Sequence, residues 1–193
     1  MENETTKDSF VHTDITSIEN KTNKSNDSDC NFDKFLNDPE IPKLAKDLFN
    51  NTAKNPVDNE PLMYFEKFSS KDKQEREFYF KAVTNSYKVA DGAYSEGLGY
   101  SGKAYIENNP KAFAMFFDNK ICLTEIDLET WSDILILEFA IENEGERYNL
   151  IIDQFINKLK SKCKNCSMTQ TETINKFGLI LNEKWQAYLK NIN

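Results

Sequence analysis

The segment Trp131-Ser-Asp-Ile-Leu-Ile-Leu-Glu-Phe-Ala-Ile141 decides the fold of this chain, because it is apolar almost all round. A helix of that kind is covered by its neighbours on most sides. We therefore expect residues 131–141 to form the central helix of a hydrophobic core. A buried strand at 134–137 is the competing interpretation. It is disfavoured because the flanking sequence stays helical and no second strand of this kind follows.

Apolar residues on both sides of this segment recur at helical spacing. Spacings of three and four predict one helix that carries a single stripe, made of Phe80, Val83, Tyr87, Ala90, Tyr94 and Gly97. Downstream, stripes at 148–159 and 171–191 predict two long helices that pack antiparallel through short loops. The sequence thus predicts an all-α domain over residues 32–193, a single bundle or array of about five to seven helices.

The first thirty residues have a different composition. They contain 17 Asn, Asp, Ser and Thr and only six apolar residues, too few to offset the entropy of ordering them. We predict that residues 1–31 are a disordered polar tail or linker. The tail carries no signal peptide. A cytoplasmic location is favoured, while a periplasmic or surface-tethered one would follow if an export signal has been removed.

The charge and the single histidine restrict the function. The net charge is −8 with a pI of about 4.9, which argues against binding to nucleic acid or to anionic lipid. No apolar run is long enough for a transmembrane segment. His12, in the polar tail, is the only imidazole, so a Ser–His–Asp triad or a histidine-containing zinc site is not expected. We expect no cofactor and a protein that is not an enzyme.

A glycine cluster resembles a phosphate-binding loop. Gly97-Leu-Gly-Tyr-Ser-Gly-Lys103 matches the Gly–Lys spacing of such loops, but Ala104 stands where a magnesium-binding Ser or Thr is needed, and no strand precedes it. Close helix packing is the main interpretation of these small residues. The alternative is a ligand groove, whose candidate residues are Gly97, Gly99, Tyr100, Gly102, Lys103 and Tyr105.

Carboxylates crowd the region around the central helix. A solvated acidic face explains most such clusters, but an acidic ridge also fits a partner with a basic surface. The ridge would consist of Asp127, Glu129, Asp133, Glu138, Glu142, Glu144, Glu146 and Asp153. Glu138 and Glu142 lie four residues apart, so they also suit acid–base work in a carboxylate-based hydrolase.

The four cysteines leave several chemistries open. Cys163 and Cys166 form a C-x-x-C in a predicted loop, where a disulfide is one candidate. Inert thiols, a redox site or a four-cysteine metal site with Cys30 and Cys122 are the alternatives.

These observations lead to one function hypothesis and two alternatives. The first is a non-enzymatic acidic helical protein that binds another protein, such as an inhibitor or immunity-type factor that neutralises a basic toxin or enzyme. The second is a protein that binds a small ligand in the groove of glycines and tyrosines. The hydrolase is the third. The sequence leaves the oligomeric state open.

Overall fold

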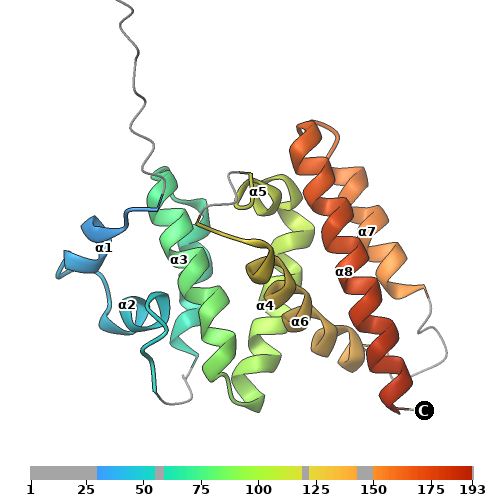
Figure 1. Cartoon of the computed structure of the whole chain (residues 1–193), viewed down its shortest axis with the longest axis horizontal. Helices are drawn as coiled ribbons and strands as arrows, with labels where there is room; N and C mark the ends of the chain where they lie inside the picture. Colours follow the sequence, from blue (N-terminus) through green and yellow to red (C-terminus); the bar gives the residue numbers. More distant parts are fainter. Residues whose placement is uncertain (1–29, 55–58, 119–121, 143–149, 193) are drawn as a thin grey trace, which may run out of the picture.

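The computed structural model describes residues 30–54, 59–118, 122–142 and 150–192 (Figure 1). These residues form eight α-helices and two 3-10 helices and contain no strand, which confirms the all-α prediction. Five of the eight α-helices have twelve or more residues. The predicted tail, residues 1–31, lies outside the described residues apart from Cys30 and Asn31.

The first helices pack on α3. Helices α1 (Asp33–Asn37), α2 (Lys43–Phe49) and η1 (Glu60–Ser69) precede α3 (Lys73–Ser86). The buried Asn85 amide of α3 donates hydrogen bonds to the carbonyls of Leu48 at 3.1 Å and Phe49 at 2.9 Å, which satisfies the end of α2. Phe78 of α3 stacks on Phe35 and Phe49, with ring centroids 5.3 and 4.8 Å apart. The short helices α1 and α2 therefore form one flank of the molecule (Figure 1).

The single helix predicted from Phe80 to Gly97 is wrong, because the chain breaks between Ser86 and Gly92. A 3-10 turn, η2 (Tyr87–Val89), follows α3, and α4 (Gly92–Asn108) begins after it. Asp91 is extended, and its carboxylate accepts a hydrogen bond from the backbone N–H of Tyr94 at 2.8 Å, so it starts a new helix. The hydroxyls of Ser86 and Tyr94, 2.7 Å apart, join the two helices across the break.

Helix α6 (Glu125–Glu142) is the predicted central helix, and its place in the core is confirmed. Trp131, Leu135 and Phe139 have no exposed surface, and α6 packs on both α4 and α8. The Asp127 carboxylate accepts a hydrogen bond from the N–H of Thr124 at 2.8 Å, which closes the first turn. One of its own residues thus caps the first turn of α6, and α4 and α8 pack against the helix.

The last two helices cover the other flank. Helices α7 (Ile151–Lys162) and α8 (Met168–Ile192) lie side by side and run in opposite directions, as predicted (Figure 1).

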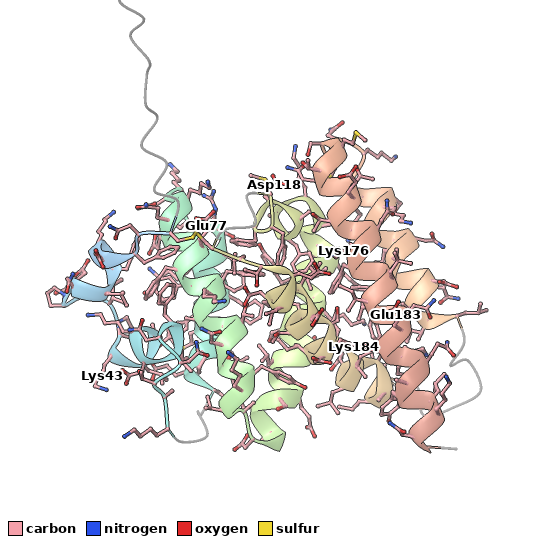
Figure 2. All side chains as sticks on the ribbon, viewed as in Figure 1. Lys43, Glu77, Asp118, Lys176, Glu183 and Lys184 are labelled. Carbon is pink, nitrogen blue, oxygen red and sulfur yellow. A yellow bond between two sulfur atoms is a disulfide. The ribbon has the colours of Figure 1, made fainter. Side chains whose placement is uncertain are left out.

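Helices α6 and α8, in contrast, are parallel, and two ion pairs at their surface reflect this register. Lys176 pairs with Glu125 and Lys184 with Asp133, each at 2.6 Å, and the second pair is eight residues further along both helices. Figure 2 shows Lys176 and Lys184 along α8. None of the described helices combines the length and hydrophobicity that a membrane span requires.

Candidate functional site

A cavity of about 280 Å³ lies where η1 and the start of α3 meet the end of α4 and helix α5 (Pro110–Met115). Its volume is just below the usual range for ligand pockets, about 300–1,000 Å³. One set of lining residues is mainly apolar, namely Phe68, Tyr105, Ala112, Met115 and Phe116. The other set is polar or charged, namely Ser69, Ser70, Lys73, Arg76, Glu77 and Asn109.

Tyr105 lines this cavity and carries the most informative polar atom near it. Its hydroxyl oxygen is buried and has no hydrogen-bond partner among the described residues. The rings of Phe65 and Phe68 meet the Tyr105 ring edge-on, with centroids 6.1 and 5.0 Å away, so the side chain is held in place. Burial raises the pKa of Tyr105, against the opposing charge of Arg76, so the hydroxyl stays a neutral donor. A buried polar group without a partner costs about 1–3 kcal/mol.

Positive charge lies beside that hydroxyl. Arg76 donates a hydrogen bond through Nη1 to the carbonyl of Ser70 at 2.6 Å, and among the described residues it makes no ion pair with a carboxylate. Lys73 pairs with Glu77 at 3.7 Å, and Figure 2 labels Glu77 in the first half of α3. Two cations and one carboxylate therefore line the cavity, which leaves it with a net positive charge.

Several hydrogen bonds hold the start of α3, next to the groups that line the cavity. The Asp72 carboxylate accepts hydrogen bonds from the N–H groups of Gln74 and Glu75, and an ion pair with Lys34 lowers its pKa. The Ser70 hydroxyl donates to the Glu75 carboxylate, and this bond lowers the pKa of Glu75. The carbonyl that holds Arg76 belongs to the same fixed residue, Ser70.

Of the six predicted groove residues, only Tyr105 lines this cavity. The glycines instead allow close packing: a Cβ would approach Leu62 at Gly97, Glu138 at Gly99 and Trp131 at Gly102 to about 3 Å. The cluster lies inside α4 and does not form a phosphate loop.

The other two groove candidates point elsewhere. Tyr100 is 69% exposed. Lys103 forms ion pairs with Glu142 at 2.6 Å and Glu107 at 3.9 Å.

Two glycines of α4 should respond to alanine in opposite directions. At Gly102, a Cβ would lie 2.9 Å from the ring of fully buried Trp131, so Gly102→Ala should destabilise the fold by about 1–3 kcal/mol. At Gly92, nothing lies within 4 Å, so Gly92→Ala should be neutral or stabilising by up to about 1 kcal/mol. Urea unfolding followed by circular dichroism compares the two. Equal effects would contradict the packing interpretation.

The eight predicted ridge residues do not share one exposed face. Helix α6 turns Asp127 and Glu138 inward, where they are buried, and Asp127 pairs with Lys81 at 2.6 Å. Asp133 and Glu142 are engaged by lysines of α8 and α4. Only Glu129 and Asp153 are exposed without an ion pair in the described part of the chain, and Glu144 and Glu146 lie outside it.

Glu138 is the most perturbed of these carboxyls. Its side chain is buried between α6 and α4, and burial raises its pKa; nearby Glu142 adds to this and Lys103 opposes it. In the folded chain the protonated form is therefore favoured more than in the unfolded chain.

This shift predicts that Glu138→Gln raises the stability of the fold by an amount that depends on pH. The raised pKa of Glu138 stabilises the folded chain at pH values below the pKa that this carboxyl has in the unfolded chain. This stabilisation is lost as the pH rises through the pKa that the carboxyl has in the folded chain. Because glutamine stays neutral, Glu138→Gln should match the native chain near about pH 4 and have a higher melting temperature at neutral pH. Thermal unfolding across this range tests it, with exposed Glu129→Gln as the control. A variant less stable than the native chain at neutral pH would contradict the assignment.

All four cysteines lie in disulfides. Cys163 is bonded to Cys166 within the turn between α7 and α8, and Cys30 is bonded to Cys122. The Cys30–Cys122 disulfide ties the start of the described domain to the segment that precedes α6. Among the described residues, no cluster of His, Cys, Asp and Glu could hold a metal ion.

Sequence reasoning missed Arg76, Lys73 and Asn109, because no motif joins two residues of α3 to the junction between α4 and α5. The one available signal is that Arg76 is one of only two arginines in the chain. Comparisons with protein-family models, curated proteins and solved structures found no match to this chain. The function is therefore argued from the site itself.

Proposed function

We propose that this protein binds a small organic anion with an apolar part in the cavity lined by Arg76 and Tyr105. The observation that carries the proposal is the buried Tyr105 hydroxyl, which has no hydrogen-bond partner among the described residues. The hydroxyl exposes almost no surface, so a ligand oxygen reaches it only when the neighbouring side chains shift slightly. A ligand oxygen that then accepts this hydrogen bond would remove the cost of leaving the group unpaired.

The charge around the cavity favours an anion. Arg76 donates to the Ser70 carbonyl, and no carboxylate of the described residues forms an ion pair with it. A guanidinium binds carboxylates and phosphates through paired hydrogen bonds, which are stronger than those between neutral groups. Lys73 adds a second cation, while Glu77 sets a limit on how much negative charge the inner site can take.

The remaining surface favours an apolar body on the ligand. Phe68 and Phe116 are almost fully buried in the core, and they present ring surface to the cavity beside Ala112 and Met115. Ligand pockets commonly combine such apolar walls with a few placed polar groups. We therefore assign binding, without chemical turnover, to a compact amphipathic anion such as an aliphatic carboxylate.

The hypothesis of a basic protein partner at the acidic ridge stays a separate prediction. Its residues are divided between buried, paired and exposed surroundings, so no single described surface favours it over the cavity.

The test compares the native chain with Tyr105→Phe. Octanoate should raise the melting temperature of the native chain, because a ligand that binds only the folded state stabilises it by about 2.7 kcal/mol at a hundred times its Kd. Without ligand, Tyr105→Phe should be as stable as the native chain or more stable, because it removes an unpaired hydroxyl. Its affinity for octanoate should fall about tenfold or more, as expected for losing a hydrogen bond to a charged group.

Two controls keep this test specific. Inorganic phosphate has the charge but lacks the apolar body, so it should stabilise the native chain less than octanoate does. An unchanged octanoate affinity in Tyr105→Phe, or no stabilisation by any carboxylate, would contradict the proposed function.

A further inference from the structure

We infer that the ligand carries a second anionic group at its far end, held outside the cavity by Lys111 and Lys162. This inference rests on the proposed function and deepens it, because it turns an amphipathic monoanion into an elongated dianion. The argument uses a neighbouring hollow, the way its lysines are held and the turn that supports them.

A shallow hollow adjoins the cavity on the outer side of α5. It has a volume of about 550 Å³, and three of its lining residues, Asn109, Ala112 and Met115, also line the cavity. Met115 is 44% exposed, and its flexible thioether side chain can move aside or pack along a chain that crosses it. One ligand can therefore occupy both spaces, with its apolar middle over Ala112 and Met115.

Two lysines supply the charge of this outer hollow. Lys111 donates a hydrogen bond to the carbonyl of Asn165 at 2.9 Å, and Lys162 donates to the carbonyl of Glu107 at 2.7 Å. Among the described residues, neither makes an ion pair with a carboxylate. A backbone carbonyl fixes an ammonium group in space but leaves its charge available to a ligand.

Arg76 is held in the same way in the inner cavity, by the carbonyl of Ser70. Elsewhere, five lysines reach a carboxylate at 2.6 Å, namely Lys81, Lys103, Lys158, Lys176 and Lys184. On a chain with a net charge of −8, three cations positioned by carbonyls along adjoining hollows form a strip that opposes the overall charge. Such a strip fits a ligand with an anionic group at each end.

The Cys163–Cys166 disulfide supports the outer end of this strip. Lys162 directly precedes the disulfide loop, and Asn165, whose carbonyl holds Lys111, lies inside it. The C-x-x-C motif therefore has a structural part in the site, since it fixes the turn that positions both lysines.

The experiment measures the Kd of matched carboxylates by calorimetric titration. The two series are the monocarboxylates and the dicarboxylates from six to twelve carbons. In the native chain, the dicarboxylate affinity should peak at one chain length and exceed that of the matching monocarboxylate about tenfold, the scale of one added charge-assisted contact. Lys162→Gln should reduce this preference to about twofold or less and leave the monocarboxylate Kd unchanged. Lys111→Gln, measured in parallel, should do the same.

The matched control is Lys160→Gln, an exposed lysine on the same helix that does not line the hollow. It should keep the full preference for dicarboxylates. Equal binding of the two series at every length, or an equal loss in Lys160→Gln, would overturn the second anionic group while the inner site stands. If no carboxylate of either series binds, both this inference and the proposed function fail.

Discussion

Trp131→Ala should lower the free energy of unfolding by about 3–5 kcal/mol, the usual cost of removing a large aromatic side chain from a core. Trp131 has no exposed surface and stacks on Phe80, with ring centroids 4.9 Å apart. Its indole Nε1–H donates a hydrogen bond to the Thr84 hydroxyl at 2.8 Å, so the substitution also leaves a buried oxygen without its donor. The Gly102 backbone packs against the same ring.

The cost is expected at the high end, because the space around Trp131 cannot collapse. The ring is surrounded by α3, α4 and α6, and each of these helices is held by other contacts. Urea unfolding at equilibrium measures the change. Ile126→Ala is the matched control on the same helix, since Ile126 is 71% exposed and should contribute little. A loss as small as that of Ile126→Ala would show that α6 is not the centre of the core.

Removal of the Cys30–Cys122 disulfide should cost about 4–5 kcal/mol. Its cysteines are 92 residues apart, so the bond restricts a long stretch of the unfolded chain. Cys163 and Cys166 are only three residues apart, and in the same chain-entropy view their bond contributes about 2 kcal/mol. The Cys30→Ser/Cys122→Ser variant should therefore lose about twice as much stability as Cys163→Ser/Cys166→Ser.

Urea unfolding of the two double variants under oxidising conditions makes this comparison. Adding a reductant to the native chain should reproduce the sum of the two losses. If reductant leaves the unfolding midpoint of the native chain unchanged, the two disulfides do not contribute to its stability.

Local patterns in the sequence predicted the helices well, whereas their arrangement needed the structure. Residues 131–141 are apolar almost all round, so the burial of Trp131, Leu135 and Phe139 was expected without knowing any neighbour, although Leu137 and Ile141 are 36% and 48% exposed. The break before Gly92 was missed because the apolar spacing continues through it, and only the Asp91 cap reveals it. The parallel course of α6 and α8 involves contacts between residues far apart in the sequence, such as the ion pair of Glu125 with Lys176, 51 positions away.

The site was less predictable than the fold, for the same physical reason. Tyr105 was singled out as a tyrosine near small residues, but its importance comes from a hydroxyl that has no partner. Arg76 reaches the cavity from α3 and Asn109 from the junction between α4 and α5, so their spacing in the sequence carries no signal. The sequence shows how many acidic residues α6 carries, but it does not show that Asp127 is buried and pairs with Lys81.

A crystal structure of the protein grown with octanoate tests the central claim most directly. We expect the octanoate carboxylate within hydrogen-bonding distance of both the Tyr105 hydroxyl and the Arg76 guanidinium. The alkyl chain of octanoate should lie against Phe68 and Met115. A structure in which octanoate lies elsewhere, or in which the Tyr105 hydroxyl bonds to another protein group and the cavity is closed, would contradict the account.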